Sequence, residues 1–434
     1  MTTRLWCEWA WLGGEAAEPG VVVAIDGESI VSVQPDVARC PSDAVPRPGV
    51  TLPGLVNAHS HVFHRALRGR THGGKGSFWT WRDQMYGLAA LLDPDSLYAL
   101  GRATYAEMAL AGVTTVGEFH YVHHDVGGRR YADPNAMGHA LIAAARDVGL
   151  RLVLIDACYL EGGVGRPLEG VQLRFGDGSV HAWAERVDAL EASPGVEVAA
   201  AIHSARAVSP GDMKEVARWA ADHSAPLHAH VSEQPAENQA CLDAYGSTPT
   251  QLLYDAGALA CDFTAVHAIH VTDGDAGLLG GSTVCVCPTT ERDLADGIAP
   301  SGRLRDAGAV LAVGSDSNAV IDLLEEARGI ELDTRLATGE RGTHPAAELL
   351  GAATGRAVLA AGAAADLITI GLGSVRLAGT MGADLLGAVT FSATASDVSH
   401  VMVGGREVVR DGAHVSIDVA GDLDRAVRAA WGER

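Results

Sequence analysis

Eight short apolar runs, separated by stretches that suit helices, recur between residues 54 and 318. Continuous apolar runs of this length are typical of strands that are buried on both faces. Strands that alternate with helices form parallel sheets, and about eight of them close into a barrel. We therefore predict an α/β fold, a (β/α)8 TIM-like barrel. The runs are one that ends at His59 and those within residues 113–119, 150–157, 195–204, 224–234, 263–272, 282–290 and 308–318.

Two of the intervening helices carry recognisable start and stop signals. Residues 93–112 begin with an Asp cap and Pro94 in the first turn, and they end at a glycine. Asp133-Pro134 is predicted to open a second helix, which closes at Gly149.

The two ends of the chain have a different pattern. Residues 21–33 contain two β-rich runs joined by Asp26-Gly27, a strong hairpin signal. Residues 399–412 repeat the theme with Gly404-Gly405 as the turn. Two β-rich ends therefore bracket the predicted barrel.

Composition and charge disfavour several kinds of binding partner and cellular location. The chain has 32 basic and 54 acidic residues, a formal net charge of −22, so nucleic acid and anionic membranes would be repelled. The N-terminus does not resemble a signal peptide, and no apolar run approaches the ~20 residues that span a bilayer. The seven cysteines form no CxxC pair, which disfavours a zinc ribbon or a disulfide framework. We expect a cytoplasmic protein.

Titratable side chains gather at the C-terminal ends of the apolar runs, which is where barrel enzymes carry their active sites. A core packed only for stability would not collect them there. They are His59, His61, residues 118–121 and 203–206, His230, Glu233, His267, Ser315 and Asp316.

His59 and His61 are two residues apart at a strand end, so both imidazoles point to one face. Alone, such a pair is more often structural than a metal site. His230, with Glu233 three residues on, and the late Asp316 change that balance. Three imidazoles, one carboxylate and an open position for water make a catalytic mononuclear metal site.

Motifs along the whole chain resemble the amidohydrolase superfamily of metal-dependent hydrolases. Within it, the chain most resembles the branch that removes ammonia from N-formimino-L-glutamate. That resemblance implies a discontinuous small β-sandwich domain from residues 1–53 and 365–434, beside a barrel at 54–364. The motifs are "LPGLVNAHSH", "HSHVFHRAL", "FWTWRDQMY", "GEFHYVHH", "AIHSARAV", "HAHVSEQ", "VHAIHVT", "CPTTERDLADG" and "GSDSN".

The resemblance also implies a role for each matching residue. One divalent metal ion per chain, usually zinc, would be held by four ligands, and two further residues would join Asp316 in acid–base catalysis. His64 departs from the pattern, because some relatives carry Gln there; both side chains can donate a hydrogen bond to a carboxylate. The ligands are His59, His61, His230 and Asp316; the acid–base residues are Glu233 and His267; the substrate contacts are His64, Arg82, Tyr121, His203, Arg206 and Ser315.

The implied reaction follows from general chemistry. The metal would lower the pKa of its water to around 7, and Asp316 and His267 would orient the resulting hydroxide for attack on the formimino carbon. Glu233 would carry a proton to the departing nitrogen. The products would be N-formyl-L-glutamate and ammonia, in histidine degradation.

Arginines at the rim suit a small anionic substrate. Formiminoglutamate has two carboxylates, and Arg82 and Arg206 are each able to pair with one. Each alone is more simply a surface ion pair. Related barrels commonly pair through helices, so a homodimer is our expectation.

Three rival functions remain open. A deaminase of a neutral ring such as guanine or a pterin would share the metal, Glu233 and His267, but would not need two arginines. A barrel without catalysis, acting as a scaffold or binding protein, would typically have lost a ligand, and none is missing. A metal-storage protein would need more sites than these histidines offer.

Several other histidines have simpler explanations. His228 shares a strand face with His230 and is more simply a core or supporting residue. His123, His124 and His270 are expected to be structural. His72 lies in the Gly-rich segment 68–78, which we interpret as a possible lid over the site.

Overall fold

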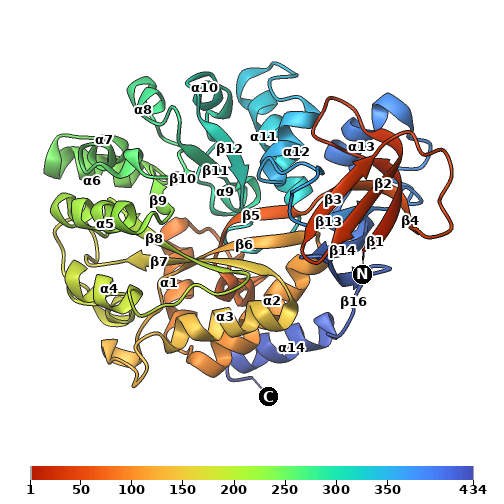
Figure 1. Cartoon of the computed structure of the whole chain (residues 1–434). Coiled ribbons are helices and arrows are strands. Elements are labelled where there is room, and N and C mark those ends of the chain that lie inside the picture. Colours follow the sequence, from red (N-terminus) through yellow and green to blue (C-terminus); the bar gives the residue numbers. More distant parts are fainter. Residues whose placement is uncertain (1, 434) are drawn as a thin grey trace.

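Eight parallel strands form a barrel in the computed structural model, which describes residues 2–433 (Figure 1). The hydrogen-bonded order follows the sequence from the first barrel strand to the last. Each strand matches one of the eight apolar runs, and β5, β6 and β7 each extend one residue beyond theirs, so the predicted α/β barrel is confirmed. The strands are β5 (Leu55–Ser60), β6 (Val113–His120), β7 (Arg151–Cys158), β8 (Val196–Ser204), β9 (Leu227–Val231), β10 (Phe263–His267), β11 (Thr283–Val286) and β12 (Val310–Val313).

The barrel closes through residues that were predicted to bind metal. The Asp316 amide donates to the His59 carbonyl at 2.9 Å, and the His61 amide donates to the Asp316 carbonyl at 2.9 Å. These two bonds join the end of β5 to the segment after β12. The hydrogen bonds that close the barrel therefore also bring the predicted metal ligands together.

Glycine is required where the closing segments approach each other. A Cβ atom at Gly314 would lie 2.7 Å from the His59 carbonyl oxygen, and one at Gly117 would lie 2.7 Å from the Ala58 oxygen. Backbone atoms cannot yield as flexible side chains do, so any larger residue would push β5 away from its neighbours.

Helices surround the barrel, with shorter turns at its rim (Figure 1). Most follow a barrel strand and return the chain for the next one. The α-helices are α1 (Phe78–Ala89), α2 (Pro94–Leu110), α3 (Ala136–Val148), α4 (Val180–Val187), α5 (Pro210–His223), α6 (Pro235–Tyr245), α7 (Pro249–Asp255), α8 (Asp273–Leu278), α9 (Pro288–Leu294), α10 (Ser301–Asp306), α11 (Leu323–Thr338), α12 (Ala346–Ala353), α13 (Leu385–Ser392) and α14 (Val419–Ala430). The 3-10 turns are η1 (Val62–Leu67), η2 (Val126–Gly128), η3 (Gly170–Arg174), η4 (Ala258–Ala260), η5 (Gly382–Asp384) and η6 (Ala395–Asp397).

One predicted helix start is confirmed and the other is shifted. The Asp93 side chain caps α2 by accepting from the Ser96 amide, as predicted. Helix α3 starts at Ala136, because Asp133 instead accepts from the amide of Asn135 and pairs with His139.

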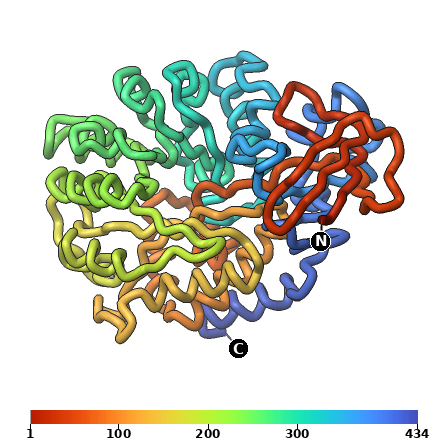
Figure 2. The backbone as a smooth tube through the Cα atoms, viewed as in Figure 1, coloured from red at the N-terminus to blue at the C-terminus, as the bar shows by residue number. Residues whose placement is uncertain are grey.

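The two chain ends build a second sheet beside the barrel, where red and blue segments meet (Figure 2). The hairpins at Asp26-Gly27 and Gly404-Gly405 are present; φ is positive at Gly27 and at both later glycines. The hydrogen-bonded order of the eight strands is β16-β15-β14-β13-β4-β1-β2-β3. The two-layer sandwich and the boundaries 1–53, 54–364 and 365–434 stay predictions. The strands are β1 (Thr3–Ala10), β2 (Glu18–Asp26), β3 (Ser29–Gln34), β4 (Val45–Pro53), β13 (Leu367–Ile370), β14 (Val398–Val403), β15 (Arg406–Arg410) and β16 (Ala413–His414).

Within residues 2–433, none of the helices combines the length and the apolar character needed to cross a membrane.

Candidate metal centre and active site

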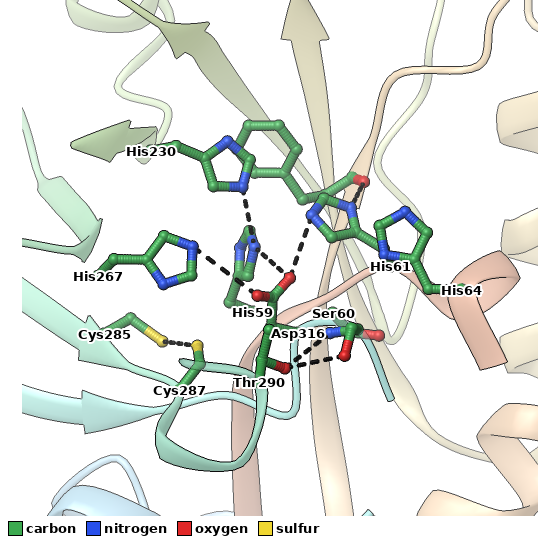
Figure 3. Close-up of polar contacts among 12 residues, drawn as sticks. His59, Ser60, His61, His64, His230, His267, Cys285, Cys287, Thr290 and Asp316 are labelled. Carbon is green, nitrogen blue, oxygen red and sulfur yellow. Dashed lines mark hydrogen bonds and ion pairs between the residues drawn. The ribbon is translucent and has the colours of Figure 1, made fainter. Parts of the chain in front are cut away.

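Three imidazoles and one carboxylate converge at the C-terminal end of the barrel (Figure 3). The Nε2 atoms of His59 and His230 lie 3.2 Å apart. Asp316 Oδ1 lies 3.4 Å from Nε2 of His59 and 3.4 Å from Nε2 of His61. We call His59, His61, His230 and Asp316 the rim cluster. The structure brings together all four residues predicted as metal ligands.

Backbone carbonyls fix the orientation of two of these rings. His61 Nδ1 donates to the Phe119 carbonyl at 2.8 Å, and His230 Nδ1 donates to the His203 carbonyl at 2.9 Å. A proton held on Nδ1 leaves the Nε2 lone pair free, and that lone pair points into the cluster. This arrangement is the one that supports a metal-bound imidazole.

The protonation states of the rim cluster suit a cation. Burial lowers the pKa of both His61 and His230 well below 6.5, so these rings are neutral near pH 7. Burial alone would raise the pKa of Asp316, but its hydrogen bond with His59 and the charges of three imidazoles hold it below its usual range. Neutral imidazoles and an ionised carboxylate, all unpaired with any arginine, fit one divalent ion of the zinc type.

His267 stands beside the rim cluster with acidic groups on both sides. Its Nε2 atom lies 3.7 Å from Asp316 Oδ2 and 3.7 Å from Glu233 Oε1, while Nδ1 faces Glu291 Oε1 at 3.3 Å. Burial lowers the pKa of His267, but the bond to Glu291 and the charges of Glu233 and Asp316 outweigh burial and raise it to about 10. A dication nearby would lower it again.

Backbone strain is concentrated at the same rim. His267 has φ 72° and Asp316 has φ 42°, and Ser232, which precedes Glu233, has φ 50°. Non-glycine residues rarely adopt this left-handed region, and such strain is typical of active sites. These turns direct the side chains of Asp316 and His267 toward each other.

A cavity of about 300 Å³ opens above the rim cluster, large enough for a small organic molecule. All the predicted site residues except His59 and Ser315 line it. His59 is fully buried beneath the cavity floor, where it contacts Asp316. The predicted residues in the lining are His61, His64, Arg82, Tyr121, His203, Arg206, His230, Glu233, His267 and Asp316.

Ser315 does not line the cavity. Its hydroxyl donates to Asn318 Oδ1 at 2.6 Å and accepts from Asn57 Nδ2 at 2.7 Å. The hydroxyl thus acts both as a donor and as an acceptor, and the side chain is fully buried. The Ser315 side chain thus links the segment after β12 to β5, and its predicted contact with the substrate stays a prediction.

The two predicted arginines are in different electrostatic situations. The Arg82 guanidinium lies 4.5 Å from the Trp79 ring centre and 5.3 Å from that of Tyr86, and its Nε is buried without a hydrogen-bond partner. Arg206 Nη2 donates to Glu233 Oε2 at 3.0 Å. Arg82 is thus held by aromatic rings and free of carboxylates among the described residues, whereas Arg206 is already paired.

His64 and Tyr121 form one hydrogen-bonded pair in the cavity wall, with His64 Nε2 2.9 Å from the Tyr121 hydroxyl. Burial lowers the pKa of His64 to about 3, so this ring is a neutral hydrogen-bonding group. His203 is half-buried beside them, with its ring 4.4 Å from that of Tyr159.

Sequence reasoning missed Glu237 and Glu291, which contact Arg206 and His267. It also missed Arg166, which lines the cavity mouth, and several aromatic residues in the wall. The only available signal for Glu237 was its place four residues after Glu233, one helical turn away.

His123, His124 and His270 were expected to be structural, and each makes a structural contact. His124 pairs with Asp177 at 3.0 Å, and His270 Nε2 donates to the Asp296 carbonyl. His72 pairs with Asp293 at 2.6 Å, linking the possible lid segment 68–78 to the other side of the rim.

His120, His123 and Asp156 form a second buried group, which we call the rear cluster. His228 is buried and does not line the cavity.

Residues 50–408 match the amidohydrolase family, so the chain belongs to that family. Formimidoylglutamate deiminase of Pseudomonas aeruginosa is 36% identical over 84% of this chain and 86% of its own length. The 8-oxoguanine deaminase of the same bacterium is 30% identical, over 96% of this chain and 94% of its own. The chain is thus a hydrolase that acts on carbon–nitrogen bonds, and its resemblance to formimidoylglutamate deiminases is confirmed.

Solved structures show the same fold along the whole chain. An amidohydrolase from Brucella melitensis superposes with a TM-score of 0.89 at 28% identity, covering 99% of this chain and 100% of its own. Atrazine chlorohydrolase from Arthrobacter aurescens, solved as a zinc complex, gives a TM-score of 0.85 at 23% identity, again covering 99% and 100%. The second likeness concerns the fold alone.

Proposed function

We propose that this enzyme hydrolyses N-formimino-L-glutamate to N-formyl-L-glutamate and ammonia, a step of histidine degradation, in the cytoplasm. The observation that carries the proposal is Arg82, a half-buried cation in the cavity wall that lies against aromatic rings and has no carboxylate partner among residues 2–433. A partly desolvated cation without a counter-ion favours an anionic ligand. The deiminase named above supports the same substrate.

His59, His61, His230 and Asp316 would hold one divalent ion, with zinc the expected metal. When bound, that ion would lower the pKa of a water molecule toward 7 and so make hydroxide available in neutral solution. His267 Nε2, facing Asp316 and Glu233 across 3.7 Å, would orient the attacking oxygen. Its position between two acceptors leaves it little rotational freedom.

Glu233 would move the proton. One of its oxygens faces His267, and the other accepts from Arg206. Its side chain is only 7% exposed, so few water molecules contact it. Glu233 Oε1 would take a proton from the attacking water and deliver it to the nitrogen that leaves as ammonia.

The carboxylates of the substrate would contact the cavity wall. Arg82 would pair with one of them and Arg206 with the other. The His64–Tyr121 pair and His203 would supply hydrogen bonds between these ends.

The first experiment measures ammonia release from N-formimino-L-glutamate by the purified zinc-loaded protein and by Glu233→Gln. We expect release by the wild type and a loss of at least ~100-fold in the variant, since general acid–base groups contribute about 10²–10⁴-fold. Glu161→Gln is the matched control. Glu161 lines the same cavity, but its carboxylate accepts from the Gly165 amide, so this variant should keep wild-type activity. No release by wild-type protein that holds one zinc would refute the proposal.

A second function, deamination of a neutral heterocycle, is favoured by one observation. Phe78, Trp79 and Trp81 line the cavity, and flat rings would stack on them. The 30% identity with an 8-oxoguanine deaminase points the same way. Ammonia release from guanine, 8-oxoguanine and a pterin in the same assay distinguishes the two functions. Arg82→Met should impair turnover of formiminoglutamate and spare turnover of a neutral ring.

We also propose a homodimer, which light scattering of the zinc-loaded protein would test. A mass corresponding to one 44.9 kDa chain would reject it.

A further inference from the structure

Arg206 lies between two carboxylates that both come from the segment after β9. Its Nη2 donates to Glu233 Oε2 at 3.0 Å, and its Nε lies 3.7 Å from Glu237 Oε1. The opposite side of the guanidinium faces the Phe78 ring, with Cζ 5.6 Å from the ring centre. Arg206 is therefore held from two sides by acidic groups, of which only Glu233 has a role in the proposed reaction.

Glu237 has an ordinary structural role, but that role uses only one of its oxygens. Glu237 lies in the first turn of α6, and its Oε2 accepts from the Glu233 amide at 3.1 Å. An acidic residue in a first turn commonly reaches back to the amides that precede the helix. The other oxygen, Oε1, is buried and has no hydrogen-bond partner. Arg206 is the cation that it faces.

The burial of Glu237 makes this second contact significant. The side chain is 0% exposed, so a charge there is costly unless a cation compensates for it. Burial raises the pKa of the Glu237 carboxyl above its usual value, and Arg206 opposes that rise. Burial lowers the pKa of Arg206, but the charges of Glu237 and, next, of Glu233 outweigh burial and raise it. The arginine is thus shared, and neither carboxylate holds it alone.

We propose that Glu237 is a positioning residue that holds the Arg206 guanidinium partly away from Glu233. Arg206 then presents a free edge to a carboxylate of the substrate, and Glu233 keeps an oxygen available for proton transfer. Without the charge of Glu237, Arg206 would close on Glu233 and occupy both of its oxygens. This inference rests on the proposed function for its substrate, but not for its geometry.

Glu237→Gln tests the idea, because the amide oxygen still accepts from the Glu233 amide while the charge is lost. We expect kcat for N-formimino-L-glutamate to fall about tenfold, an ordinary coupling for residues in direct contact, with one zinc still bound. KM should rise as well, because Arg206 would turn from the substrate carboxylate to Glu233. Glu237→Asp keeps the charge and should recover most of kcat. Glu215→Gln, the same change at an exposed residue of α5 outside the cavity, should leave kcat unchanged.

A double-mutant cycle separates positioning from a general structural defect. In an Arg206→Gln background there is no guanidinium to hold, so adding Glu237→Gln should change kcat by less than about twofold. A tenfold fall that persists in that background would overturn the proposal. A kcat within twofold of wild type in the single variant Glu237→Gln would overturn it as well.

A crystal structure of zinc-loaded Glu237→Gln supplies a readout that needs no substrate. Arg206 should contact both oxygens of Glu233 in the variant and only one in the wild type. An unmoved Arg206 would overturn the proposal even if activity fell. If the wild type releases no ammonia from formiminoglutamate, the proposed function fails, and the position of Arg206 still decides the role of Glu237.

Discussion

The rim cluster and the rear cluster contain similar residues, yet the structure gives them opposite electrostatic surroundings. Each brings together at least two imidazoles and one aspartate, all buried. In the rim cluster Asp316 faces imidazole nitrogens. In the rear cluster Asp156 accepts from both Nη atoms of Arg186, at 2.7 and 2.8 Å, and from the Trp183 indole at 3.1 Å. Among residues 2–433, Asp316 contacts imidazoles and no arginine or lysine, whereas Asp156 is paired with an arginine.

This difference decides which cluster suits a metal ion. A dication near Asp156 would be repelled by Arg186, which is buried in contact with that carboxylate. The rear cluster also lies outside the cavity wall, so an ion or a substrate has no direct access to it. Close spacing of histidines and acids is therefore not enough. What distinguishes a metal-ligand set from a structural network is whether an arginine already balances the charge of the carboxylate.

The largest expected effect is the loss of metal from the rim cluster. His59→Ala removes one of four donors, so we expect zinc content to fall well below one per chain. Activity should fall by more than ~100-fold, the upper end for residues that merely support a ligand. His123→Ala makes the same change in the rear cluster and should leave zinc content unchanged. Elemental analysis of both dialysed proteins measures this, and equal zinc loss from both would break the comparison.

Removal of Arg186 from the rear cluster should have the reverse effect of His59→Ala: it should lower stability and leave the zinc content unchanged. Arg186 pairs with Asp156 and with Asp177, both fully buried, so Arg186→Met leaves two uncompensated carboxylates. Asp177 keeps its contact with His124, so Asp156 loses the most. We expect a loss of about 3–5 kcal/mol in the free energy of unfolding, with zinc content unchanged.

Urea denaturation of the zinc-loaded protein measures that loss. The control is Arg129→Met, whose exposed pair with Asp125 should contribute less than ~1 kcal/mol. Asp156→Asn added to Arg186→Met should recover part of the stability. A loss as small as that of the control would show that the buried pairs do not matter.

The comparison also shows what the sequence was able to predict. The strands were predictable because each is a continuous apolar run, and the His59–His61 pair followed from side-chain alternation in a strand. The ends of adjacent parallel strands meet at one rim, so His230 and Asp316 could be added without knowing any distance. These inferences depend on local pattern and on one global rule about barrels.

Contacts between distant residues were not predictable in the same way. Arg186 reaches Asp156 from 30 positions away, and nothing in the local sequence marks them as partners. Ser315 and Asp316 are neighbours at one strand end, yet only Asp316 faces the cavity. The left-handed backbone of Asp316 and the two asparagine contacts of Ser315 separate them, and both depend on barrel closure.

Glu118 supplies a third buried carboxylate and extends the comparison to pH. Its Oε1 accepts from the Val62 amide, its Oε2 has no hydrogen-bond partner, and no cation pairs with it in the described structure. Burial raises the pKa of Glu118 from 4.5 to about 8. The folded protein thus binds a proton that the unfolded chain releases between these values, and stability falls as pH rises from about 5 to 8.

Glu118→Gln should remove that part of the pH dependence. The free energy of unfolding of the variant relative to the wild type should increase by up to a few kcal/mol between pH 5 and pH 8, because ionised Glu118 destabilises only the wild type. Urea unfolding midpoints at the two pH values measure the difference. If the gap between the proteins were the same at both pH values, Glu118 would not be the group that titrates.

The smallest expected effect concerns His64, the rim histidine that is outside the ligand set. Its ring is neutral, contacts the Tyr121 hydroxyl and lines the cavity, so a glutamine can replace its hydrogen bond without changing the charge. We expect His64→Gln to keep one zinc and to change kcat/KM by less than about tenfold, the equivalent of one ordinary hydrogen bond. Kinetics at matched zinc loading measure it. Loss of zinc would move His64 into the rim cluster and show that the cavity wall and the ligand set are not separate.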